Sequence, residues 1–554
     1  MISKIKLQFG SSGTKGALET DLTPITVFVG PNNSGKSKLL LEIEEYSKNG
    51  KINSKSVILS DLVFSKIIDP EEEIRKHTLI PTPRENLAPN QIVFGDSTIR
   101  NKIDKSNLFM YLNDIETYKV YFCSFYLYFN TLRLGGGNRI NLIHEQPGGD
   151  LQGNPQNILQ VLFQDNNKRQ EVRRIIYDAF KKYFVIDPTK LGYLRIKLSE
   201  TPPNDEIQER GIHQDAIDFH NKALDINLAS DGVKAFTGII TTIIAGDPKV
   251  ILIDEPEAFL HPSLAYNLGK EVSNSVNGSF KNLFVSTHSS NFLMGCIQSG
   301  VPINIVRLTY SNNSPTARIL PSDKVLKLMR HPLLRSTGVL NGLFYEYVIV
   351  TEADSDRAFY QEINDRLLAF NPDKGIPNCL FLNAQNKQTI HEILRPLREM
   401  GIPCVAIVDV DVIKEGGKVW SNLLSSANIP NVTIQSTGIS RGHLKSAFDG
   451  KQINFKTNGG VNLLDSQDRQ ACNDLFDQLD EYGIFTVRNG ELESWLKSLG
   501  VTSSHSPEWL IEIFEKLGED PTSSNYVKPS SGDIWDFMHK IKTWFFNPSR
   551  KGTP

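Results

Sequence analysis

The chain has 554 residues and a formal net charge of −3, with 39% hydrophobic and 22% charged residues. This length exceeds what one hydrophobic core supports, so it predicts two or three domains of ordinary globular composition. The charge excludes a globally basic nucleic-acid binder, so any DNA contact must depend on local patches. The sequence has no signal-peptide pattern and no apolar run of about 18 residues or more, so we expect a cytoplasmic protein with no membrane partner.

The cysteine pattern indicates a reduced interior. The cysteines are odd in number, widely spaced and mostly in apolar surroundings. Their spacing does not match a zinc site. We therefore expect reduced core residues at Cys123, Cys296, Cys379, Cys404 and Cys472.

A phosphate-binding loop motif follows the predicted strand at residues 24–30. The strand runs directly into a Gly-x4-Gly-Lys-Ser motif, and residues 39–46 then have helical spacing. In this context, backbone N–H groups and the helix N-terminus bind the β- and γ-phosphates of ATP, a lysine adds positive charge and a serine hydroxyl binds Mg²⁺. The predicted nucleotide-binding residues are Gly30, Asn32, Asn33, Gly35, Lys36 and Ser37.

The next hundred residues are less informative. The aromatic segment 118–129 predicts a buried strand, because aromatic residues at this density are typical of a core. Arg133 and Arg139 flank a run of three glycines, where one of them could reach a phosphate, although a surface loop is the favoured interpretation. Residues 155–184 have apolar residues at helical spacing and predict one amphipathic helix or two.

Three further motifs point to nucleotide chemistry. Ser230 and Gly232 open a predicted helix, either as an ordinary cap or as an anion-binding turn. An apolar strand pattern then ends at Asp254 and Glu255, which would hold the metal-bound water shell and polarise the attacking water, respectively. The next strand pattern is followed by His288, which either senses the γ-phosphate or is an ordinary polar residue.

The order of these motifs resembles that of the ABC-type ATPase heads of structural-maintenance-of-chromosomes and RecF proteins. In that family, the Ser-x-Gly motif completes the nucleotide site of a facing head. The resemblance therefore implies that Ser230 and Gly232 bind nucleotide across an interface. It also implies a homodimer or a higher even-numbered oligomer.

Acidic residues at strand ends define a second site. One apolar strand pattern ends at Glu352, with Asp356 four residues later, and after a predicted helix a second ends at Asp409 and Asp411. Residues two apart on an extended backbone point the same way, and carboxyl ends of parallel strands meet at one sheet edge. An isolated Asp-x-Asp is usually a solvated loop or a cap, but both motifs in order favour a Mg²⁺ or Mn²⁺ site.

A third strand pattern is followed by Glu491 and Glu493. These carboxylates either complement a helix dipole or add metal ligands, and the acidic surroundings favour ligands. Lys387 lies in the loop before the crossover helix, where we expect an approach to substrate phosphate. Lys497 is the nearest candidate for a catalytic lysine, although an ordinary surface lysine is an equal interpretation.

The acidic motifs resemble a TOPRIM domain, and the whole order resembles the OLD (overcoming lysogenisation defect) nucleases. The resemblance implies an α/β fold, with an ABC-type P-loop ATPase domain followed by a Rossmann-like TOPRIM domain. The implied domains are an ATPase head at 1–330, a helical link at 331–343, a TOPRIM domain at 344–500 and a C-terminal helical extension at 501–554. The implied catalytic residues are Glu255, His288, Glu352, Asp409 and Asp411. The implied metal ligands are Ser37 beside ATP and, for two further ions, Glu352, Asp356, Asp409, Asp411, Glu491 and Glu493.

The resemblance implies an ATP-gated, divalent-metal-dependent DNA endonuclease that acts in anti-phage defence, with a retron effector as one form. A reverse transcriptase with noncoding DNA or RNA, or an accessory helicase, is left open as a partner. The alternative is an ATP-dependent sensor or scaffold whose TOPRIM domain binds nucleic acid without cutting. The basic, aromatic stretch 540–551 could grip single-stranded nucleic acid, but a terminal helix that docks on the body is favoured.

Overall fold

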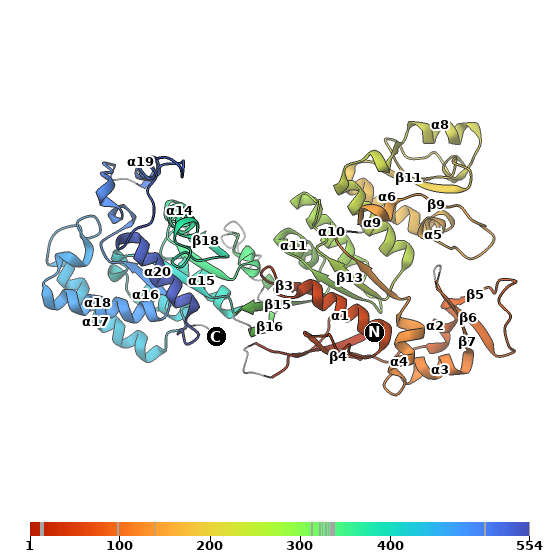
Figure 1. Cartoon of the computed structure of the whole chain (residues 1–554), viewed down its shortest axis with the longest axis horizontal. Coiled ribbons are helices and arrows are strands. Elements are labelled where there is room, and N and C mark those ends of the chain that lie inside the picture. The colour runs from red at the N-terminus through yellow and green to blue at the C-terminus, as the bar shows by residue number, and fades with distance from the viewer. Residues whose placement is uncertain are drawn as a thin grey trace. The chain divides into compact units, whose positions relative to one another are not determined.

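The computed structural model describes residues 1–11, 16–96, 99–137, 139–311, 314–320, 323, 325–326, 330, 332, 338–503 and 506–552. The chain divides into two compact units, Met1–Ser322 and Asp323–Pro554 (Figure 1). Most of residues 321–337 lie outside the described part, so the predicted boundary at 330 and the predicted link at 331–343 stay predictions. Within the described residues, no helix combines the length and apolar character that a membrane span requires.

A mostly parallel sheet forms the centre of the first unit. Its strands run in the order β16-β15-β3-β14-β13-β8, and only β16 is antiparallel to its neighbour within the described part of the sheet. The middle strands are almost fully buried, as continuous apolar runs predict for parallel strands. The strands are β3 (Ile25–Val29), β8 (Thr131–Leu134), β13 (Val250–Asp254), β14 (Asn282–Ser286), β15 (Ile303–Ser311) and β16 (Ser314–Leu320).

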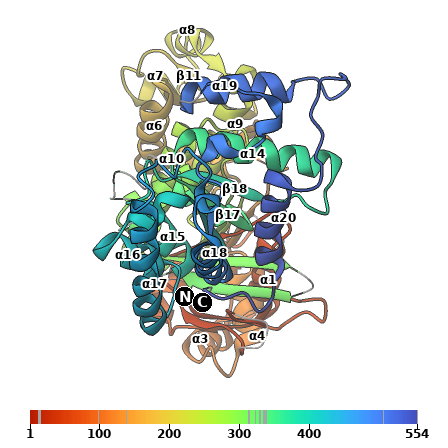
Figure 2. The same ribbon diagram turned by 90° about the vertical axis from the view of Figure 1, so that its left-hand side faces the viewer.

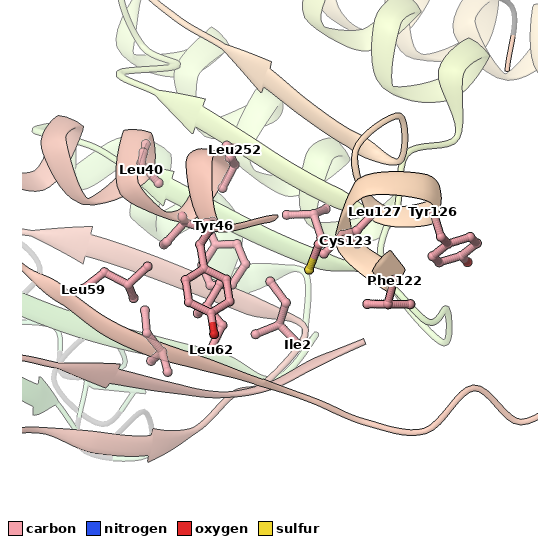
Figure 3. Packing of buried hydrophobic residues seen from close by; sticks show 14 of the residues in the cluster. Ile2, Leu40, Tyr46, Leu59, Leu62, Phe122, Cys123, Tyr126, Leu127 and Leu252 are labelled. Atoms are coloured by element: carbon pink, nitrogen blue, oxygen red, sulfur yellow. The ribbon is translucent and has the colours of Figure 1, made fainter. Parts of the chain in front are cut away.

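The helix after the phosphate loop joins this sheet to the N-terminal strands. Figure 3 shows Leu40 and Tyr46 of this helix in one apolar cluster with Leu62, Cys123 and Leu252, all of them buried. The helix also packs against β13 and β14. This helix is α1 (Lys36–Asn49). The other elements described with it are α9 (Asp231–Gly246), α10 (Pro262–Asn274), α11 (Ser290–Gln298), β1 (Ile2–Leu7), β2 (Glu19–Asp21) and β4 (Leu59–Phe64).

The aromatic segment 118–129 is helical, so the predicted strand was wrong. Phe122, Cys123, Tyr126 and Leu127 are buried at spacings of one and four residues, which matches a helical period. The aromatic composition hid this period. The segment adjoins a small sheet, and the elements here are α2 (Pro70–His77), β5 (Thr78–Leu79), β6 (Gln91–Gly95), β7 (Arg100–Asp104), α3 (Lys105–Asn113), α4 (Lys119–Phe122) and the π-helix η1 (Cys123–Leu127).

The region after β8 forms a separate layer of short strands and helices. The predicted amphipathic stretch 155–184 contains a helix pair, α5 and α6. A buried ion pair between Arg169 and Glu209, 3.1 Å apart, ties α6 to α7. The elements are η2 (Arg139–Ile143), β9 (Gln146–Pro147), α5 (Ile158–Gln164), α6 (Asn166–Phe180), β10 (Tyr183–Asp187), β11 (Tyr193–Ser199), α7 (Glu206–Arg210), α8 (Gln214–Lys222), β12 (Leu224–Asp225) and η3 (Ile226–Leu228).

The second unit contains a parallel sheet in the order β18-β17-β19-β20. The predicted strands and the predicted crossover helix of this unit are confirmed. A helical segment between β19 and β20 includes α17, which packs along α18 (Figure 2). The elements are η4 (Val339–Phe344), β17 (Tyr347–Thr351), α14 (Asp354–Phe370), β18 (Cys379–Asn383), α15 (Ile390–Glu399), β19 (Cys404–Asp409), η5 (Val410–Lys414), α16 (Gly417–Ser426), α17 (Asn431–Asp449), η6 (Gly460–Leu463), α18 (Ser466–Glu481) and β20 (Ile484–Val487).

The C-terminal stretch docks on the second unit. Trp544 and Phe545 are buried, and the Trp544 indole donates a hydrogen bond of 2.8 Å to the Glu481 carbonyl. The docking interpretation of residues 540–551 is therefore confirmed. All the cysteines are free, as predicted. The last elements are η7 (Leu492–Ser494), η8 (Lys497–Leu499), α19 (Ser506–Leu517) and α20 (Asp533–Phe546).

Arg398 at the end of α15 joins several backbone segments of this unit. Its side chain is fully buried, and burial lowers its pKa to about 10. The guanidinium donates to the carbonyls of Cys404, Ala427, Tyr482 and Gly552 at 2.7 to 2.9 Å. Because buried carbonyls are costly to leave unpaired, this one side chain holds together the ends of a strand, two helices and the C-terminus.

We predict that Arg398→Met destabilises the second unit by about 3 kcal/mol or more, since several buried carbonyls lose their donors at once. Urea unfolding followed by tryptophan fluorescence measures this directly, because every tryptophan of the chain lies in this unit. Arg395→Met is the matched control, since Arg395 is exposed on the same helix. Equal unfolding midpoints for the two variants would contradict the role given to Arg398.

Candidate nucleotide and metal sites

The phosphate loop connects β3 to α1. Gly30 and Gly35 have φ of +144° and +92°, and a Cβ on Gly30 would lie 2.0 Å from the Leu308 carbonyl oxygen, so the loop conformation requires glycine there. Lys36 donates to the carbonyls of Gly30 and Pro31 at 2.9 and 2.8 Å. Burial lowers the Lys36 pKa to about 8. The loop is thus preformed, with a buried lysine held by backbone acceptors.

Three further predicted loop residues, Asn32, Asn33 and Ser37, are exposed. Asn32 and Asn33 are exposed, and Asn33 has φ of +60°. Ser37 is exposed at the start of α1, and its hydroxyl donates to the Asp254 carboxylate at 2.8 Å. The structure therefore brings Ser37 and the end of β13 together, as a shared metal site requires.

The loop after β13 is fixed by a partly buried carboxylate. Glu257 accepts hydrogen bonds from the Thr287 hydroxyl at 2.8 Å and from the His288 N–H at 2.7 Å, while burial raises its pKa. The His288 Nε2 lies 3.6 Å from a Glu255 carboxylate oxygen. Glu255 and His288 thus lie together. The sequence analysis gave no role to Glu257, although the third acid of Asp-Glu-Pro-Glu was a signal for it.

Ser230 and Gly232 lie at the start of α9. The Ser230 side chain makes no capping hydrogen bond within the described residues, so it is not an ordinary cap there. A Cβ on Gly232 would lie 2.7 Å from the Phe259 carbonyl oxygen, so a glycine lets the loop after β13 approach the helix. Their predicted contact with the nucleotide of a facing copy stays a prediction.

Three carboxylates converge at the carboxyl edge of the sheet in the second unit. Glu352 follows β17, Asp409 ends β19 and Asp411 lies in η5. Each offers an oxygen within 4.8 Å of the others. The Glu352 carboxylate also accepts the Asp409 N–H at 3.0 Å, which fixes one acid relative to the next. Such a group of hard oxygen donors suits Mg²⁺ or Mn²⁺.

Like charges and loss of solvent act on these acids together. Desolvation and then the Asp409 charge raise the pKa of Glu352 to about 8. Desolvation raises the pKa of Asp409 to about 6, against the opposing effect of Lys456. Such shifts are expected where carboxylates share one space. A divalent cation at this place would relieve the repulsion.

Two lysines partly neutralise the cluster. Lys456 Nζ lies 2.9 Å from Asp409 and 3.4 Å from Glu491, and Lys387 Nζ lies 2.5 Å from Asp411. Burial lowers the pKa of Lys456, but the Asp409 charge outweighs this and raises it above the usual value. Lys387 was expected near substrate phosphate, whereas Lys456 was not singled out from the sequence.

Two glycines allow the loop of Lys456 to pack closely against its neighbour. Gly460 and Gly490 both have positive φ, and a Cβ on Gly490 would lie 2.2 Å from the Lys456 carbonyl oxygen. The polar loop that carries Lys456 therefore packs directly against the loop that carries Glu491. Lys497 is exposed in η8, and no ion pair joins it to these acids within the described residues.

The outer predicted ligands lie around the cluster. Asp356 accepts the Ala353 N–H at 2.9 Å and so caps α14, while burial and then the Asp409 charge raise its pKa to about 7. Burial raises the pKa of Glu493, with the charges of Glu491 and Asp409 adding to the shift. These acids are thus electrostatically coupled to the central group, and their role as ligands stays a prediction.

Comparisons with known proteins agree with this division of the chain. Residues 163–294 match the family model described as "AAA domain, putative AbiEii toxin, Type IV TA system". Residues 343–411 match the family model described as "Overcoming lysogenization defect protein-like, TOPRIM domain". The first match contains the β13 acids and His288, and the second contains Glu352, Asp409 and Asp411.

Individual relatives are more distant. The Old nuclease of Escherichia phage P2 is 24% identical over 263 residues, which are 44% of this chain and 43% of the relative, so the match spans less than half of that protein. An SMC head bound to the C-terminal winged-helix domain of ScpA covers 59% of this chain and 99% of its own, at 14% identity and a TM-score of 0.35. The Thermotoga maritima SMC head domain covers 58% of this chain and 99% of its own, at 14% identity and a TM-score of 0.30. Both TM-scores are too low to support an inference.

The two family matches follow one another along the chain, and the first does not include the phosphate loop at residues 30–37. The chain therefore contains a region that matches an AAA-type ATPase domain, followed by a region that matches an OLD-like TOPRIM domain.

Proposed function

We propose that this protein is an ATP-gated, divalent-metal-dependent endonuclease that cuts DNA. The observation that carries the proposal is the convergence of Glu352, Asp409 and Asp411 at one sheet edge, with Lys456 against them. The match to an OLD-like TOPRIM domain and the printed name of the phage P2 relative, a nuclease, support it.

The donor set fits Mg²⁺ or Mn²⁺. Glu352, Asp409 and Asp411 would hold one ion, and Asp356, Glu491 and Glu493 are the candidate ligands of a second. Bound divalent ions would supply Lewis-acid stabilisation of the attacking and leaving oxygens in phosphodiester hydrolysis. Ser37 and Asp254 would hold a separate Mg²⁺ with ATP.

The residues of the chain itself would orient the DNA phosphate. Lys456 and Lys387 carry positive charge into the acidic cluster from two different loops. Once a divalent cation neutralises the acids, both ammonium groups are free to contact a phosphate. Lys456 is the better candidate for contact with the reacting phosphate, because it reaches both Asp409 and Glu491.

A basic segment beside the acids offers a surface for the DNA backbone. Between Val412 and Gly460 the acids are Glu415 and Asp449 alone, although the whole chain is slightly acidic. The exposed lysines here would contact backbone phosphates without reading sequence. They are Lys414, Lys418, Lys445 and Lys451.

The ATPase domain would gate cutting through dimerisation. In our proposal, Ser230 and Gly232 of one copy meet the nucleotide on the phosphate loop of another. Glu255 polarises the attacking water, and His288 lies beside it. We also propose anti-phage defence as the setting, with a retron role dependent on a neighbouring reverse transcriptase.

The first functional prediction concerns the metal. Wild type should nick or cut plasmid DNA with Mn²⁺, whereas Asp409→Asn should not. Without nucleotide, Mn²⁺ at about a hundred times its Kd should stabilise wild type by about 2.7 kcal/mol, because it binds only the folded protein. Asp409→Asn should gain much less. Metal-free, the variant should fold about as stably as wild type, because lost repulsion offsets the lost ion pair to Lys456.

Asp474→Asn, an exposed acid on α18, is the control for this experiment. The titration should be repeated in a Lys36→Ala background, which removes nucleotide-dependent metal binding. An equal rise in melting temperature for wild type and Asp409→Asn would show that Asp409 is not a ligand. Full biological activity of Asp409→Asn would favour the sensor or scaffold alternative.

The second functional prediction concerns ATP. Lys36→Ala should lose ATP binding, because the phosphates lose their buried positive charge. Glu255→Gln should bind ATP with near-normal affinity and hydrolyse it at least about a hundredfold more slowly, because the water loses its polarising carboxylate. Equilibrium binding of a fluorescent ATP analogue and phosphate release separate these effects. Equal ATP affinity in wild type and Lys36→Ala would disprove the phosphate-loop assignment.

The third functional prediction compares two lysines. Lys456→Ala should slow DNA cutting by about a hundredfold or more, as expected for a lost positive charge at a reacting phosphate. Lys497→Ala should cut like wild type, because its side chain is exposed and has no ion pair to the acids among the described residues. Single-turnover cleavage at saturating Mn²⁺ measures this difference. The reverse order of effects would restore Lys497 as the catalytic candidate.

A further inference from the structure

We propose that Arg139 is a positioning residue for ATP hydrolysis, and that it links the helix α9 to the carboxylate of Glu255. The inference rests on the proposed role of Glu255 in polarising water. Arg139 lies in η2, outside the phosphate loop and the acidic strand end. From the sequence, its favoured place was a surface loop, and the structure corrects this because the side chain is completely buried.

Arg139 contacts the backbone of the two acids at the end of β13. Its Nη1 donates to the Glu255 carbonyl, and its Nη2 donates to the Asp254 carbonyl. No carboxylate of the described residues forms an ion pair with Arg139, although Glu257 lies near enough to favour its charge. Burying a guanidinium destabilises the folded protein unless its N–H groups form hydrogen bonds. Here the two terminal nitrogens donate to consecutive carbonyls of one loop.

The backbone of Glu255 needs such support. Its φ is +50°, a left-handed conformation that residues with a Cβ rarely adopt. The Glu255 N–H donates to the Ser286 carbonyl at 2.8 Å, and its own carbonyl accepts from Arg139. The residue is therefore held from both sides, by β14 and by η2. Strained backbone at a functional residue persists where the surroundings determine it in this way.

The other face of η2 rests on α9, the helix that begins beside Ser230. A Cβ on Gly238 of α9 would lie 2.9 Å from both the Arg139 carbonyl oxygen and the Leu142 Cβ. The close approach of η2 to α9 thus depends on glycine. A displacement of α9, as when Ser230 engages a ligand, would pass through η2 to Arg139 and so to Glu255.

Steady-state ATP hydrolysis by the full-length protein tests the link. Arg139→Gln should lower kcat by about 10- to 100-fold, since misplacing a catalytic group by about 1 Å has effects of this size. Arg139→Lys keeps the positive charge but has one donor nitrogen in place of two, so it should retain part of the rate. In both variants KM for ATP should stay within about threefold of wild type, because the phosphate loop is untouched. Gly238→Ala should also lower kcat, since the added methyl group displaces η2 without removing any polar group.

Arg398→Lys is the matched control, since Arg398 is also buried and donates to backbone carbonyls, but in the other unit. It should leave kcat unchanged. A kcat for Arg139→Gln within threefold of wild type, or equal losses in Arg139→Gln and Arg398→Lys, would overturn the inference. A normal kcat for Gly238→Ala would overturn the link to α9.

Hydrogen exchange distinguishes failure of this inference from failure of the proposed ATPase. If wild type does not hydrolyse ATP, the proposed function fails, and the exchange result alone decides the inference. Amides of residues 250–258 should then exchange faster in Arg139→Gln than in wild type, while those of β3 stay unchanged. Equal exchange of 250–258 in the two proteins would show that Arg139 does not hold this loop. The same measurement on Gly238→Ala applies should Arg139→Gln fail to fold.

Discussion

Carboxylates held at the carboxyl ends of buried parallel strands are the constraint on which both units depend. Such groups lose solvent and lie close to one another, so each must be stabilised by donors or cations. In the first unit, Asp254 receives hydroxyl hydrogen bonds from Ser37 and Ser286. In the second, Asp409 and Asp411 face lysine ammonium groups. The carboxyl edge of the sheet therefore carries an acid bound by hydroxyl groups in the first unit, and a cluster of acids paired with lysines in the second.

Much of this arrangement could be predicted from the sequence, because each acid directly follows an apolar strand pattern. Strand direction then decides where Glu352 and Asp409 meet. Asp411 was expected on extended backbone but lies in the 3-10 helix η5, and it still converges with the other two acids. Lys456 could not be predicted in the same way. Its place depends on a long polar loop packing against the Gly490 loop, which is a contact between residues distant in sequence and carries no periodic signal.

The two sequence interpretations that the structure corrects have related causes. Residues 118–129 are rich in aromatic side chains, which favour strands by composition, yet their burial follows a helical period. Arg139 stands beside a glycine run, which is typical of an exposed loop, yet its guanidinium is fully buried against backbone carbonyls. In both cases tertiary packing overrode a local preference, and in both cases the partner that decided the outcome lies elsewhere in the chain.

One lysine in each site is held by oxygen acceptors, but the acceptors differ in kind. Lys36 is held by the carbonyls of Gly30 and Pro31, and Lys456 is held by Asp409 and Glu491. A phosphate group is a stronger partner for an ammonium ion than a backbone carbonyl, so ATP can displace the acceptors of Lys36 directly. The partners of Lys456 are carboxylates, which a phosphate cannot displace as easily. A cation must first neutralise those carboxylates, so metal would have to precede phosphate in the second site, whereas the first site needs no such order.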